Sequence, residues 1–90
     1  MAQFVVSYDL RKRRDYQSLY DRLAEWKALA VLESVYVINW DTDAGAIRDD
    51  LLKYMDKDDG LLVARLSGQA AWHNLDDASG PTLKKWIEGK

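Results

Sequence analysis

One carboxylate followed by a run of cations is the part of this 90-residue chain best equipped for chemistry. Asp9 closes an apolar stretch, and four cationic side chains then occupy positions 11 to 14: Arg11, Lys12, Arg13 and Arg14. A hard cation such as Mg²⁺ is held by few carboxylates, several waters and the phosphate oxygens of a substrate. Guanidinium groups bind phosphate oxygens bidentately and with little regard to sequence. The segment predicts a metal and phosphate site, in which a symmetric dimer would supply a second Asp9.

Each of these residues also has a plain structural interpretation. An aspartate after a strand commonly caps a turn, and a charge run is commonly a solvated loop. Tyr8 and Tyr16 flank the run, and either ring could stack on an unpaired base or pack in the core. Ser34 either donates a hydrogen bond near the site or is a small residue at a crowded contact. The residue types alone leave these alternatives open.

Composition excludes several classes of function. The chain has no cysteine, which excludes disulfides, thiolate metal sites and thiol nucleophiles. Its formal net charge of −2 argues against a generally basic nucleic-acid binder, so the basic character is local. A Gly-rich phosphate loop, a nucleophile elbow and a histidine pair at helical spacing are all missing from the sequence. No run approaches the ~20 apolar residues that cross a bilayer, so we expect a cytoplasmic protein without a membrane partner.

Alternating apolar residues predict the strands. The period-two pattern over residues 3–10 predicts a first strand, and the long β-favouring run over 30–40 predicts a second. Two further strands are expected over 61–66 and 69–73. On this assignment Asp9 ends a strand and points away from the face that carries Tyr8.

Three- and four-residue spacing predicts two helices between these strands. The first covers residues 16–28 with Asp15 as its cap, and the second covers residues 44–56 with Asp43 as its cap. The acidic segment after the second helix is interpreted as helix termination, with Gly60 suited to positive φ.

So short a chain with this order of elements has few compact solutions. Two crossovers that pack both helices on one face of an antiparallel sheet predict an α+β, ferredoxin-like sandwich of βαββαβ type over residues 1–75. Its first and third strands are expected to be central, which would place Asp9 at the end of a central strand. Residues 76–90 are interpreted as a linker and a short helix, too short to fold alone, that docks on its own domain or on a partner subunit.

In the predicted second strand, apolar residues occupy both odd- and even-numbered positions, so both faces of this strand carry apolar side chains. A sheet with helices on one side leaves its other face bare, and such a strand indicates that this face is covered. A second copy of the chain is the simplest cover, so the sequence predicts a homodimer.

Two short segments resemble a known family. The run from Phe4 to Leu10, followed by basic residues and a helix, and the run from Glu33 to Tyr36 resemble the CRISPR-associated Cas-two nuclease family and its VapD-like toxin relatives. The resemblance covers roughly residues 3–73 in element order. It implies a ferredoxin-like homodimer whose paired aspartates bind Mg²⁺, or Mn²⁺, at the dimer interface for phosphodiester hydrolysis. It equally implies a scaffold in spacer acquisition, with RNA or DNA and a CRISPR adaptation protein or an antitoxin as partners.

The resemblance also implies roles for particular residues. The family's metal-binding, catalytic aspartate falls on Asp9, with Tyr8 beside it, and its second-strand serine and aromatic fall on Ser34 and Tyr36 as supporting residues. Its loop arginines fall on Arg11, Arg13 or Arg14. Family members often have an arginine and a glutamine where this chain has Ala30 and Leu32.

Three classes of function follow from these residues. The first is a metal-dependent endonuclease that cuts RNA or DNA, with Asp9 as the metal ligand and Arg11 to Arg14 and Tyr16 on the nucleic acid. The second is a non-catalytic dimeric scaffold that binds nucleic acid or a protein. The third is a small interaction protein that binds no nucleic acid.

Overall fold

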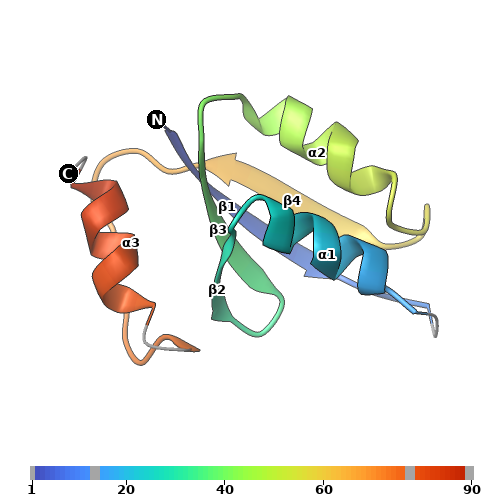
Figure 1. The fold of residues 1–90 in the computed structure, drawn as a ribbon, viewed down its shortest axis with the longest axis horizontal. Helices are drawn as coiled ribbons and strands as arrows, with labels where there is room; N and C mark the ends of the chain where they lie inside the picture. The colour runs from blue at the N-terminus through green and yellow to red at the C-terminus, as the bar shows by residue number, and fades with distance from the viewer. Residues whose placement is uncertain (1, 13–14, 77–78, 89–90) are drawn as a thin grey trace.

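The protein folds around one antiparallel sheet. The computed structural model describes residues 2–12, 15–76 and 79–88. In chain order its elements are β1 (Ala2–Asp9), α1 (Gln17–Glu25), β2 (Leu29–Leu32), β3 (Val35–Trp40), α2 (Ala44–Leu52), β4 (Gly60–Arg65) and α3 (Gly80–Ile87) (Figure 1). The strands lie in the order β2-β3-β1-β4, with each neighbouring pair antiparallel. This α+β arrangement is compatible with the predicted ferredoxin-like fold, and β1 is central as expected.

The predicted second strand over 30–40 is in fact a hairpin. Its two halves are β2 and β3, and Glu33 and Ser34 form the turn between them. Ser34 adopts a φ of 60°, in the left-handed region that Gly or Asn usually occupies at turns. Because no glycine, proline or asparagine marks this turn, the apolar run resembles one continuous strand.

The end of the predicted sheet also differs from expectation. Residues 69–73 do not form a strand, so the hairpin supplies the fourth strand instead. The strand predicted over 61–66 exists as β4, but it lies at an edge of the sheet rather than in the centre. The second central strand is β3, which pairs with β1 from Ala2 and Trp40 to Ser7 and Val35.

Both predicted helices that follow an aspartate exist, and both end earlier than predicted. Asp43 Oδ1 accepts from the Ala46 amide at 2.8 Å, which confirms it as the cap of α2. The prediction of Asp15 as the cap of α1 is wrong, because the N-cap position is Tyr16 and its side chain makes no capping hydrogen bond. Asp15 Oδ1 instead accepts from the Gln17 amide at 2.8 Å, one residue before the cap. The chain turns away from α1 at Lys27, whose φ is 54°. No helix in the described ranges is long and apolar enough to cross a membrane.

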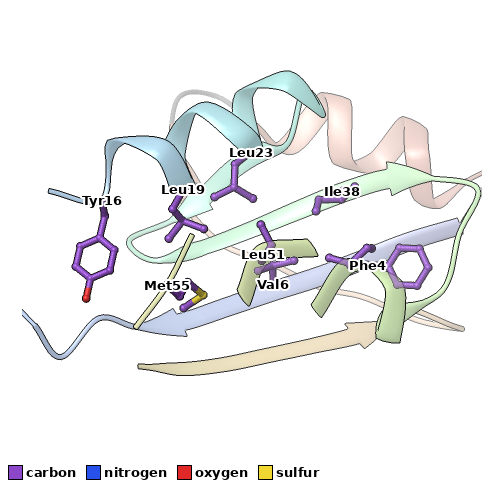
Figure 2. Close-up of a cluster of buried hydrophobic side chains, with 9 residues drawn as sticks. Phe4, Val6, Tyr16, Leu19, Leu23, Ile38, Leu51 and Met55 are labelled. Atoms are coloured by element: carbon purple, nitrogen blue, oxygen red, sulfur yellow. The ribbon is translucent and has the colours of Figure 1, made fainter. Parts of the chain in front are cut away.

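The main core lies between the sheet and the two helices α1 and α2. Phe4 and Val6 project from β1 into it, as the period-two pattern predicts. Leu19 and Leu23 project from α1 toward the sheet and belong to the same buried cluster (Figure 2). The remaining buried members are Tyr16, Ile38, Ile47, Leu51 and Met55. Burying a side chain of this size stabilises the fold by about 1.5–3 kcal/mol, so this layer holds the end of β1 in place.

The helix α3 covers part of the opposite face of the sheet. Leu83 packs there with Val31 of β2 and Val37 of β3. The buried Ser79 Oγ, just before the helix, donates to the Ala30 carbonyl at 3.1 Å. At β2 and β3, therefore, the chain's own C-terminal helix provides the cover that the sequence attributed most simply to a second copy. In Figure 1 this helix stands apart from α1 and α2.

Candidate functional site

Asp9 is the last residue of β1 and lies where the central strand meets its edge neighbour. It pairs with Gly60, the first residue of β4. The Asp9 side chain is 70% exposed, so its carboxylate faces solvent. The backbone alternation places it on the sheet face opposite Tyr8, as predicted. The strand therefore presents a carboxylate to solvent on a rigid support.

The Asp9 carboxylate already has a partner in the chain. Arg11 Nε donates to Asp9 Oδ2 at 3.1 Å, and Arg11 Nη1 donates to the Asp58 carbonyl at 2.9 Å. A methyl group at Gly60 would lie 3.0 Å from Arg11 Nη2 and 3.4 Å from Asp9 Cβ. Gly60 is not among the positive-φ residues, so that prediction is wrong. The glycine instead leaves room for the guanidinium beside the backbone.

Asp59 joins the basic turn to the acidic loop before β4. Its Oδ1 accepts from the Arg11 amide at 2.8 Å and from the Tyr16 hydroxyl at 3.0 Å. Its Oδ2 accepts from the Asp56 amide at 2.8 Å. The interpretation of this loop as mere helix termination missed that role. The one available signal was an acidic run, 56–59, of opposite charge to the run at 11–14.

The structure describes two of the four residues of the basic run, Arg11 and Lys12. Lys12 Nζ lies 2.9 Å from Asp58 Oδ2, so Lys12 and Arg11 both pair with carboxylates of this chain. Arg13 and Arg14 lie outside the described residues. Exposed ion pairs of this kind stabilise a protein by about 0.2–1 kcal/mol. Binding of a phosphate group to the same cations can readily compensate for the loss of these pairs.

Tyr16 is a core residue and not an exposed platform. The residue is 6% exposed, and its ring stands at one end of the buried cluster (Figure 2). Burial raises the pKa of Tyr16, and its hydrogen bond to Asp59 raises it further. A buried ring cannot stack on a base, so this placement contradicts the base-stacking alternative and leaves Tyr16 with the packed one.

Tyr8, Ser34 and Tyr36 come together on the helix side of the sheet. The rings of Tyr8 and Tyr36 stack with centroids 6.1 Å apart and an interplanar angle of 25°. The Tyr8 amide donates to the Ser34 carbonyl at 3.2 Å. Burial raises the pKa of Tyr8, and the charge and hydroxyl of Tyr36 raise it further, while a hydrogen bond with the Ser34 side chain lowers it. The structure thus groups these three residues but keeps their side chains apart from Asp9, on the other face.

The donor set for a metal is small. Within the described ranges, no three His, Cys, Asp or Glu side chains gather closely enough to hold an ion. Asp9 is a hard oxygen donor that solvent reaches, which suits Mg²⁺ when waters and substrate oxygens complete its coordination. The nearby carboxylates of Asp58 and Asp59 are engaged by Lys12 and by the Arg11 amide and Tyr16 hydroxyl. Asp9 is therefore a single donor, and these residues would hold such an ion only if another copy supplied a second Asp9.

No protein-family model and no curated protein sequence matches this chain.

Proposed function

We propose that this chain hydrolyses phosphodiester bonds in RNA or DNA, as a Mg²⁺-dependent homodimer of the CRISPR-associated Cas-two or VapD-like type. The observation that carries the proposal is the placement of Asp9. A carboxylate that is 70% exposed stands at the end of a central strand, two residues before the basic run begins at Arg11. Rigid strand ends beside loops are where chemistry is commonly placed in proteins.

The uncovered half of the sheet supports the dimer. On the face opposite α1 and α2, the β1 and β4 side chains include Val5, Ser7 and Leu62, and Leu62 is 62% exposed. Asp9 is two residues beyond Ser7 and four beyond Val5 in β1, so its side chain points to the same face and lies at the end of it. A second copy that packs on this half by the same face would bring the two Asp9 carboxylates toward one axis.

The proposed roles of the residues follow from this dimer. Asp9 from each subunit would hold Mg²⁺, or Mn²⁺, which when bound neutralises charge on the phosphodiester and activates water. The basic run from Arg11 to Arg14 binds the phosphates on either side of the scissile bond. Ser34 and Tyr36 support the end of β1 through their contacts with Tyr8.

A non-catalytic scaffold is the second candidate, and a specific contact favours it. Arg11 neutralises Asp9 within the chain, so the strand end can be a structural ion pair beside a nucleic-acid-binding loop. Such a dimer would bind RNA or DNA, or a protein partner such as an adaptation protein or an antitoxin, without cutting.

Cleavage and binding assays on the same variants separate these candidates. The purified protein is incubated with RNA and DNA in Mg²⁺ or Mn²⁺, and binding is measured in EDTA as salt is raised. Asp9→Ala should abolish cleavage while leaving the dimer and its salt-sensitive binding unchanged. The matched control is Asp58→Ala, which removes an exposed carboxylate from the same end of the molecule.

Each outcome decides between classes. Binding without cleavage by the wild-type protein would reject the nuclease and retain the scaffold. If Asp9→Ala cut as well as the wild type, Asp9 could not be the metal ligand. An absence of salt-sensitive binding would leave only an interaction protein that does not use nucleic acid.

A further inference from the structure

We propose that copies of this chain pair through the outer edge of β4, so that two sheets join into one. The occupant of the edge is β4 of a second copy, which runs antiparallel to the first about a two-fold axis at Leu62. This contact goes beyond the proposed function, because the Asp9 dimer packs through the bare face of the sheet and the new contact uses its edge.

The outer edge of β4 presents backbone groups that β1 does not use. Among the described residues, β4 pairs with β1 alone. The Leu66 amide donates to the carbonyl of Gln3 at 2.8 Å, and Gln3 lies directly opposite Leu66 when the register of the two strands is continued. Because bonded and non-bonded pairs alternate along an antiparallel ladder, the even-numbered residues of β4 bond to β1. The amides and carbonyls of Leu61 and Val63 therefore point away from β1.

The two edges of the sheet are protected differently. At the other edge, β2 is only four residues long and has an irregular register between Ala30 and Leu32. Ser79 Oγ also donates to the Ala30 carbonyl at 3.1 Å. Short, irregular and covered edges are those that resist pairing with another chain. By contrast, β4 is six residues long, pairs with β1 in an unbroken register and contains neither proline nor lysine. Its edge is thus open to a further strand.

Exposure and charge select a second copy of β4 and one register. Leu62 is 62% exposed, more than any other large apolar side chain that the structure describes. Arg65 and Asp59 each lie three residues from Leu62, so an antiparallel pair centred there places Arg65 of each copy opposite Asp59 of the other. No ion pair joins Arg65 to another described residue. Opposite charges across a strand pair stabilise it, and this register supplies two such pairs.

The helix side of the edge has room for side chains of the second copy. Leu61 and Val63 pack against the main core, so they face the helices. A hollow of about 200 Å³ lies beside them, and Ala44 and Gly45 at the start of α2 line it with little bulk. In the proposed register, Val63 and Leu61 of the second copy lie opposite Leu61 and Val63 on this same side. They enter the hollow and remove apolar surface from water.

Amide exchange of the full chain separates this contact from the face-to-face dimer. The outward amides of Leu61 and Val63 should exchange about ten-fold more slowly at millimolar than at micromolar protein, as expected when about nine-tenths of the chains are paired. The amides of Leu62 and Ala64, which point to β1, are the internal comparison and should change less. Dimers that leave Leu61 and Val63 unprotected would overturn the edge contact and retain the face contact. An edge that stays unprotected in a monomer, or that only another protein protects, would overturn it too.

A matched pair of lysine substitutions locates the contact. Leu62→Lys brings two like charges together at the axis and should abolish the concentration-dependent protection. Ser7→Lys adds the same charge to the same face, but on β1, one strand inside the edge. It should weaken the Asp9 dimer and leave the protection in place. Equal loss of protection in both variants, or loss in neither, would overturn the assignment, and circular dichroism confirms that each variant is folded.

Disulfide formation tests the register. The chain has no cysteine, so Leu62→Cys introduces a single thiol at the axis. A non-hydrogen-bonded antiparallel pair brings its Cα atoms to about 4.5 Å, which a disulfide can span. Oxidation should therefore link two copies of Leu62→Cys, even when Ser7→Lys removes the face contact. The control is Ala64→Cys, whose two copies would lie about 13 Å apart and should not link. Equal linking of both variants, or linking of Ala64→Cys alone, would overturn the axis at Leu62.

Discussion

The Tyr16 hydroxyl donates to Asp59 Oδ1 at 3.0 Å and joins residues 43 positions apart in the chain. This contact connects the start of α1 to the loop that precedes β4. The same carboxylate accepts hydrogen bonds from the amides of Arg11 and Asp56. It therefore links the loop after β1 to the loop before β4. The position of the candidate site therefore depends on Asp59 as much as on the strand that carries Asp9.

Replacing Asp59 should destabilise the protein more than its partial exposure suggests. Asp59→Ala leaves the Tyr16 hydroxyl and the amides of Arg11 and Asp56 without this acceptor, and such changes cost about 1–3 kcal/mol. The free energy of unfolding in urea measures the effect.

Asp58→Ala is the control for this variant. It removes the neighbouring carboxylate, whose pair with Lys12 is exposed and contributes at most about 1 kcal/mol. Equal decreases in stability for the two variants would refute the organising role of Asp59.

The perturbed ionisation of Tyr8 predicts sensitivity to alkali. Burial is the largest cause that raises its pKa, followed by the charge of Tyr36, so the folded state favours the neutral phenol. The unfolded chain ionises near the ordinary value of 10.0. Stability should therefore be retained below about pH 10 and fall as pH rises above it.

Tyr8→Phe tests this assignment, because it removes the ionising group and keeps the ring. The urea midpoint of the variant should fall less steeply than that of the wild type between about pH 9 and pH 11. Tyr54→Phe, at a half-buried tyrosine that does not act on Tyr8, is the control and should keep the wild-type slope. A wild-type slope in Tyr8→Phe as well would show that Tyr8 is not responsible.

The pairing of Arg22 with Asp50 predicts a loss of stability in acid. Arg22 Nε and Nη2 donate to the two carboxylate oxygens of Asp50 at 2.9 and 2.7 Å, joining α1 to α2. The hydrogen bonds from Arg22 are the main cause that lowers the pKa of Asp50. A lowered pKa contributes stability above the ordinary value of 3.8, and that stability is lost as pH falls below it.

Asp50→Asn should remove this acid dependence. Its urea midpoint should be lower than that of the wild type at neutral pH, and the two should converge as pH falls below about 4. Asp49→Asn changes the exposed neighbouring carboxylate, which pairs with Arg48, and serves as the control. A parallel offset at every pH would contradict the role given to the Arg22 pair.

Local patterns in the sequence predict the elements that carry the site. The period-two run predicts β1 and its inward side chains Phe4 and Val6, and the position of Asp43 before an apolar stripe predicts its role as a cap. These features depend on neighbours within a few residues, which the sequence displays directly.

Contacts between distant residues are beyond such patterns. Asp59 lies 48 positions from Arg11, so no spacing rule links them. The turn at Ser34 carries no residue that favours positive φ, so the hairpin resembles one strand in the sequence. Tyr16 has an amphipathic side chain, and only the fold shows that its ring is buried while its hydroxyl reaches Asp59.

Charge reversal in the basic run tests whether it binds nucleic acid. The sequence places Arg13 and Arg14 between Lys12 and Asp15. Arg13→Glu combined with Arg14→Glu should weaken binding to a single-stranded oligonucleotide. It should also reduce the slope of log affinity against log salt by roughly 0.7 for each phosphate that the variant no longer neutralises. Fluorescence anisotropy across a salt series measures both quantities.

A matched pair of lysines controls for the change in net charge. Lys84→Glu with Lys85→Glu reverses two exposed charges on α3, away from the end of β1. This control should lower affinity slightly and leave the salt slope near that of the wild type. If both double variants weaken binding equally, the attraction depends on net charge, and the basic run is a solvated loop with no binding role of its own.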